Sequence, residues 1–225
     1  MKLLAIAILA FTLGIITQTV YAGCPSGYKA DSTTFTFVYS YEVPPGSGVK
    51  VDFICEVKVR YYCKWNYTLN KLEIIIDNFE GVNSGCLEAI PPSIWPLFMD
   101  EMHLKTASSV TSPCIPALYP PCDEQNINHY DVQISSKACV KIINRRAKDP
   151  KTIPQYTRIW EFCPGSAECA TTYQVCYDYS VTLPAIRRTK VFQSMIGIPD
   201  CQTEFPDIGE YTEEWETPCF ALPCP

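Results

Sequence analysis

The chain has few histidines and no closely spaced pair of cysteines. Its 225 residues include 2 His, His103 and His129, and 13 Cys, and no Cys-x-x-Cys occurs. Zinc ribbons and thioredoxin-type redox sites need close thiol pairs, so the sequence disfavours both. It also lacks a Gly-x-Ser-x-Gly turn, a phosphate-binding loop, a His-Glu-x-x-His motif and a calcium loop. The sequence therefore assigns no catalytic residue, no metal ligand and no cofactor, and it leans against an enzyme.

Basic charge is in short supply. The chain has 18 Lys and Arg against 24 Asp and Glu, a formal net charge of −6. Because phosphate binding needs a basic field, we do not expect a nucleic-acid partner. Two basic clusters, Arg145-Arg146-Lys148 and Arg187-Arg188-Lys190, are typical of solvated turns or strand edges.

Only one long apolar run is present, and it lies at the amino terminus. Residues 1–22 combine one lysine with an apolar stretch and finish with Val20-Tyr21-Ala22, which is typical of a secretory signal peptide. The run is short for a spanning helix, and nothing later in the sequence predicts a transmembrane segment. We expect a secreted or extracytoplasmic protein, whether extracellular, periplasmic or at the cell surface.

All thirteen cysteines follow the predicted signal peptide. In an exported chain the default state of such cysteines is disulfide-bonded, so all are disulfide candidates. They are Cys24, Cys55, Cys63, Cys86, Cys114, Cys122, Cys139, Cys163, Cys169, Cys176, Cys201, Cys219 and Cys224. The odd number leaves one sulfur without a partner in the chain.

Two interpretations of the odd cysteine stay open. Tyr21-Ala22-Gly23-Cys24 resembles a bacterial lipobox, which would make Cys24 a lipid anchor, but Tyr21 stands where an aliphatic residue is expected. An ordinary signal-peptidase cut after Ala22 fits the sequence better. It would leave Cys24 near a free end, where it could bond to another chain, or a different cysteine could be the odd one.

The clearest strand pattern runs from Val49 to Trp65. Its odd positions are apolar and its even positions mostly charged, which predicts a half-buried strand. Cys55 and Cys63 share the apolar side, roughly 26 Å apart at 3.3 Å per residue. A disulfide cannot span that distance, so each must bond to another part of the chain.

Further strands are predicted on both sides of one helix. Thr33–Tyr41 alternates in the same way and is joined to the strand Val49–Trp65 by a Pro- and Gly-rich turn. Lys71–Phe79 is the return strand of a second hairpin. The helix covers about residues 94–105; Ile94, Leu97, Phe98 and Met102 form its packing stripe, and His103 is expected at its surface.

A second β region begins at about Tyr130. Two disulfides within it or just before it are suggested by spacing: Cys114 with Cys122 around a Pro-rich loop, and Cys163 with Cys169 across a hairpin turn. Residues 183–198 could form either a helix or a strand. Residues 201–225 are acidic and Pro-rich, and their three cysteines predict a tail stapled to the body of the protein.

We therefore expect a mainly β fold: a disulfide-stapled antiparallel sheet or sandwich over residues 23–200, with one short helix and the tail 201–225. The expected role is binding, adhesive or surface-structural, towards another protein chain or a glycan, because exposed aromatics can contact either. The alternatives are a secreted glycan hydrolase with unidentified carboxylates and a protease inhibitor presenting a bridged loop. Asn66-Tyr67-Thr68 makes Asn66 a candidate for glycosylation. The sequence does not indicate an oligomeric state.

Overall fold

The computed structural model describes residues 25–42, 46–83, 85–109, 114, 119–123, 128–147, 151, 156–180 and 185–225. The predicted signal peptide and Cys24 lie outside this part. The elements, in order, are β1 Lys29–Glu42, β2 Lys50–Asn66, β3 Lys71–Gly81, a 3-10 turn Pro92–Ile94, α1 Trp95–Ser109, β4 Tyr130–Lys137, β5 Cys139–Arg146, β6 Tyr156–Phe162, β7 Glu168–Asp178, β8 Ala185–Ile196, β9 Trp215–Glu216 and β10 Phe220–Ala221. The fold is mainly β with one helix, as the sequence predicts.

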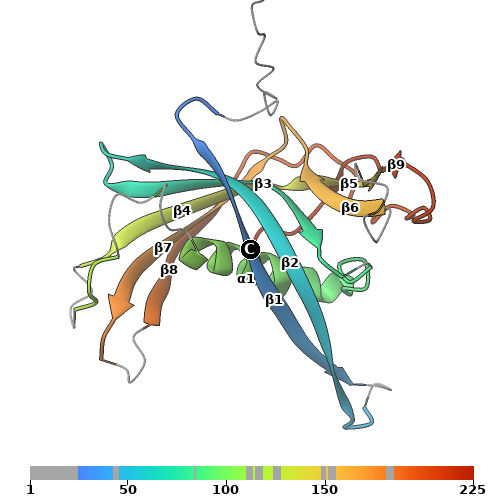
Figure 1. Cartoon of the computed structure of the whole chain (residues 1–225), viewed down its shortest axis with the longest axis horizontal. Helices are drawn as coiled ribbons and strands as arrows, with labels where there is room; N and C mark the ends of the chain where they lie inside the picture. Colours follow the sequence, from blue (N-terminus) through green and yellow to red (C-terminus); the bar gives the residue numbers. More distant parts are fainter. Residues whose placement is uncertain are drawn as a thin grey trace, which may run out of the picture.

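The strands form one sheet that forks at β3. One edge of β3 pairs with β2, which in turn pairs with β1. The other edge is shared, because β4 pairs in parallel with residues 71–75 and β6 pairs antiparallel with residues 78–79. One branch continues from β4 to β7 and β8, and the other from β6 to β5, β9 and β10. Figure 1 shows the two branches diverging on opposite sides of the molecule.

α1 packs against β1, β4, β7 and β8 on one face of the curved sheet (Figure 1). Its buried residues recur at helical spacing and include Phe98, Met102 and His103. The helix prediction is confirmed, but two of its details are wrong. Leu97 is 52% exposed, because the buried stripe is centred one residue further along the helix. His103, expected at the surface, is fully buried.

The first two predicted hairpins, β1–β2 and β2–β3, are both present. Phe35 lies opposite Val57 and Phe37 opposite Cys55, so the odd positions of both strands face the core together. The alternation of buried and more exposed side chains in β2 holds from Phe53 to Tyr61, and Tyr62 beyond it is also buried. Val49 and Val51 are exposed instead of buried, since β2 begins to pair with β3 only at Val57.

Six disulfides join segments that lie far apart in the sequence. The pairs are Cys55–Cys86, Cys63–Cys114, Cys122–Cys176, Cys139–Cys201, Cys163–Cys219 and Cys169–Cys224. Cys55 and Cys63 each bond elsewhere, as the length of their strand requires. The two local bridges suggested by spacing are wrong: Cys114 and Cys122 do not close their own loop, and Cys163 and Cys169 each bond to the tail.

The tail lies along the β5–β6 branch of the sheet. Its three cysteines bond to the body, and its short strands β9 and β10 both pair with β5. Residues 185–196, left open between helix and strand, form the strand β8. Among the described residues no helix is long and apolar enough to cross a membrane.

Candidate functional site

β1 is an edge strand without the usual protection of edges. Among the described residues β1 pairs only with β2, so its other side presents unpaired backbone groups. From Ser32 to Tyr41 it has no charged residue and no proline. Natural proteins normally block such an edge with lysine, proline or a bulge. The 14 residues of β1 pair with β2 in one unbroken register, so no bulge turns this edge away.

The end of β1 continues into a two-stranded ribbon, formed by residues 38–42 and 50–54, that extends beyond the rest of the sheet (Figure 1). Val38 lies opposite Ile54, and these side chains are 52% and 59% exposed. Tyr41 lies opposite Val51 on the other face, and both are exposed. A two-stranded hairpin is only marginally stable on its own, and contiguous exposed apolar side chains mark interaction surfaces.

The inner side of β1 is held firmly in place. Phe37 meets Phe98 of α1 edge-on, with ring centroids 5.2 Å apart, and Phe35 packs on the same ring at 6.4 Å. At the base of the ribbon Tyr39 packs on Phe53. The edge of β1 is therefore presented on a packed support, which lowers the ordering cost of any strand that pairs with it.

The opposite edge of the sheet, β8, is protected. Arg187 lies 3.9 Å from the carboxylate of Asp178, and Lys190 lies 2.6 Å from that of Asp100 in α1. A bulge interrupts its pairing with β7 opposite Thr172 and Tyr173. Its second half is apolar and exposed, but the bulge twists an edge away from simple strand addition.

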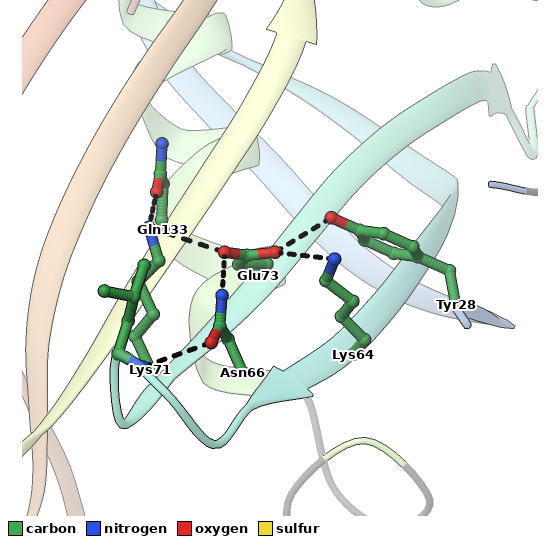
Figure 2. Close-up of polar contacts among 7 residues, drawn as sticks. Tyr28, Lys64, Asn66, Lys71, Glu73 and Gln133 are labelled. Atoms are coloured by element: carbon green, nitrogen blue, oxygen red, sulfur yellow. Dashed lines mark hydrogen bonds and ion pairs between the residues drawn. The ribbon is translucent and has the colours of Figure 1, made fainter. Parts of the chain in front are cut away.

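Glu73 is the centre of a polar cluster on the outer face of β2, β3 and β4 (Figure 2). Its carboxylate accepts hydrogen bonds from Tyr28 Oη at 3.0 Å and Asn66 Nδ2 at 2.9 Å. Lys64 Nζ lies 3.2 Å and Lys71 Nζ 3.5 Å from it. Burial alone would raise the pKa of Glu73, but the donors outweigh it and the pKa is lowered. A carboxylate that is held ionised by several donors is poorly suited to accept or donate a proton in catalysis. The polar cluster therefore links neighbouring strands and is structural.

Asn66, the glycosylation candidate, belongs to this polar cluster. Its side-chain nitrogen, the atom that would carry the sugar, donates to Glu73, and its oxygen accepts from the Leu69 amide at 3.1 Å. A glycan would replace one of the two hydrogens on this nitrogen and leave one N–H to donate to Glu73. Glycosylation at Asn66 stays a prediction.

His103 connects α1 to the β4–β7 branch from inside the core. Its Nδ1 lies 3.3 Å from Thr171 Oγ1 in β7, and its Nε2 lies 3.1 Å from Ser136 Oγ in β4. Burial, together with the charge of Lys190, lowers the pKa of His103 to about 3. The imidazole is therefore neutral at physiological pH and serves as a buried polar link.

A groove of about 1000 Å³ on the outer face is lined by three carboxylates, those of Asp31, Asp77 and Glu161. Asp77 occupies the bulge of β3 beside β2, and burial raises its pKa, with the charge of Glu161 adding to the rise. Asp77 accepts a hydrogen bond from Asn78 at 2.7 Å, and Glu161 pairs with Lys141 at 3.7 Å. These are the carboxylates that the hydrolase alternative would use.

The four tryptophans do not form an exposed aromatic surface. Trp95 and Trp160 are buried in the core, and Trp65 and Trp215 are partly buried against it. Among the described residues no group of three or more His, Cys, Asp or Glu side chains could hold a metal ion.

Sequence reasoning missed the edge position of β1. The uncharged stretch from Thr33 to Tyr41 was a usable signal, but a strand's place at an edge depends on pairing between distant segments. No protein-family model, curated protein or solved structure matches the chain.

Proposed function

We propose that this chain is an exported, disulfide-stapled β module that binds another protein by strand addition at β1. The single observation that carries the proposal is the free edge of β1, uncharged from Ser32 to Tyr41 and continuous with the apolar ribbon. In strand addition the backbone supplies affinity and alternate side chains supply specificity. The six disulfides fit an extracytoplasmic setting.

The chemistry of β1 defines the partner. Its exposed side chains Thr34, Thr36 and Ser40 are neutral, so the partner's pairing segment is an extended, uncharged stretch. That partner also presents apolar side chains, because Val38 and Ile54 must be covered together with the edge.

A different protein fits better than a second copy. In antiparallel pairing of two β1 strands, each ribbon would point away from the other copy. The faces of both ribbons would then stay uncovered, whereas a different protein can cover edge and ribbon at once.

The test is retention of the labelled mature protein on the cells that export it. Thr36→Lys places a charge on the exposed side of β1, and we expect it to reduce retention roughly tenfold. Thr189→Lys, the same change at an exposed threonine of β8, is the matched control and should alter retention less than about twofold. Thermal unfolding and the mass before and after reduction verify that both variants keep the fold.

Two results would contradict the proposal. One is that the unaltered protein is not retained, and the other is that both lysine variants behave alike. Sedimentation of the purified protein checks the competing occupant. Self-association abolished by Thr36→Lys would assign β1 to a second copy and overturn the commitment to a different protein.

A further inference from the structure

A second, smaller cavity lies where the tail meets the sheet. It has a volume of about 270 Å³ and is bounded by the end of β3, the turn that follows it, the start of β6 and Tyr211 of the tail. Its volume is just below the ~300–1,000 Å³ usual for small-molecule sites. Its lining includes Lys58 of β2 but no residue of β1.

Two buried N–H donors in the lining have no hydrogen-bond partner among the described residues. They are Nε of Arg158 and Nε1 of Trp160. The Arg158 side chain is 9% exposed, and Trp160 is fully buried. Buried donors in native proteins almost always find an acceptor, because leaving one unpaired is costly. Both donors therefore need acceptor oxygens that the described residues do not supply.

Neither side chain is free to turn elsewhere. The guanidinium of Arg158 lies 3.5 Å from the ring centroid of Tyr211 and 5.1 Å from that of Trp215, and it also donates to Gly209 O at 2.7 Å. The Trp160 ring packs against Trp95, with centroids 4.8 Å apart. The donors are fixed before any ligand arrives, which favours binding.

The ionised groups around the cavity balance. Lys58 and Arg158 are opposed by Glu80 and Glu88, so the lining has no formal net charge. Arg158 lies 3.3 Å from Glu88 Oε1, and Arg60 lies 2.9 Å from Glu80 Oε1. The second oxygen of each carboxylate can still accept a hydrogen bond from a hydroxyl group. This lining suits a neutral ligand that both donates and accepts hydrogen bonds.

Aromatic rings complete the lining. Tyr156 and Tyr211 line the cavity along with Trp160. The face of an aromatic ring attracts the C–H groups of a saturated ring, while hydroxyls around that ring reach the polar groups. We propose that this cavity binds one neutral sugar residue, whose oxygens accept from Arg158 and Trp160 and whose hydroxyls donate to Glu80 and Glu88.

This inference is independent of strand addition at β1. The probes are neutral methyl glycosides of glucose, galactose and mannose, titrated into the oxidised mature protein and followed by NMR. We expect at least one to bind with a dissociation constant on the order of 1 mM, the range open to a ligand of this size. Gluconate and glucosamine, which are charged, should bind several-fold more weakly.

Two variants locate the site. Trp160→Phe removes the indole donor and should weaken the sugar roughly fivefold or more. Trp65→Phe is the matched control, because Trp65 is a partly buried tryptophan of β2 that packs on Tyr130 and does not line the cavity; it should change affinity less than about twofold. Thr36→Lys should leave sugar binding unchanged, so failure here and failure of the proposed function are distinguishable.

A further readout avoids reliance on folding of the variants. In the unaltered protein, the Trp160 indole N–H resonance should move as the bound sugar saturates the site. No binding by any neutral glycoside below about 100 mM would overturn the inference. So would binding that leaves this resonance in place, or equal losses in Trp160→Phe and Trp65→Phe.

Discussion

The two edges of the sheet differ in whether charges and a bulge protect their unpaired backbone groups. The β8 edge carries Arg187 and Lys190, both paired with acidic side chains, and a bulge breaks its register. The β1 edge has no charge from Ser32 to Tyr41 and no bulge. Under the proposed strand addition, this difference is one of use: β8 is kept apart from other chains, and β1 is left open to one.

β1 and the pair β4 and β7 also differ in how they are attached to α1. β1 is attached to α1 by aromatic packing on Phe98, whereas β4 and β7 are attached to it through the polar link of His103. The first attachment should be insensitive to pH and the second should not. Each can be broken separately.

The largest expected effect is the loss of the aromatic attachment. Phe98 is fully buried among Phe35, Phe37 and Phe79, so Phe98→Ala should lower the free energy of unfolding by about 3–5 kcal/mol. Urea unfolding measures it. The neighbouring Leu97→Ala, at an exposed position, should cost no more than about 0.5 kcal/mol. Similar values for the two variants would show that Phe98 does not anchor β1.

An intermediate effect is expected from acid on the polar attachment. The folded pKa of His103 is about 3, against an ordinary value of 6.5. Below about pH 6.5 the unfolded chain binds a proton on this imidazole and the folded chain does not, so stability falls as the pH drops. The loss from this group between pH 7 and pH 5 is about 2 kcal/mol.

Comparison with His103→Gln isolates that contribution, because the other titrating groups are common to both proteins. The stability advantage of the unaltered chain over the variant should shrink as the pH falls from 7 to 5, as measured by urea unfolding at each pH. An advantage that stays constant over this range would mean that the pKa of His103 is the same in the folded and unfolded chains.

The smallest effect on stability is expected at the β8 edge. Arg187→Thr together with Lys190→Thr removes two partly exposed ion pairs, and the free energy of unfolding should change by less than about 1 kcal/mol. Self-association should nevertheless increase relative to the unaltered protein, because the charges that block the edge are gone. Sedimentation velocity over a range of concentrations measures this. An unchanged sedimentation profile would show that these charges do not protect β8.

Local pattern predicted much of this fold. The alternation in Thr33–Tyr41 and Val49–Trp65 placed both strands, and their shared odd-position register followed from it. The helix was placed by the spacing of Phe98 and Met102. These features depend on side-chain periodicity, which neighbouring residues determine.

What failed depends on distant contacts. Nearness in sequence suggested that Cys163 would bond to Cys169, yet the tail, more than fifty residues further on, supplies both partners. His103 was expected at the surface because its partners, Ser136 and Thr171, lie on strands that no local pattern brings next to the helix. The open edge of β1 belongs to the same class, since it depends on which strands do not pair with it.

Hydrogen exchange tests the central claim most directly. The deuterium uptake of the mature protein is compared by mass spectrometry with and without the surface fraction of the exporting cells. The account predicts slower exchange in the peptides that cover residues 32–41 and unchanged exchange in residues 185–196, because a paired strand protects the amides at the edge it joins. Protection confined to β8, or no protection at either edge, would contradict it.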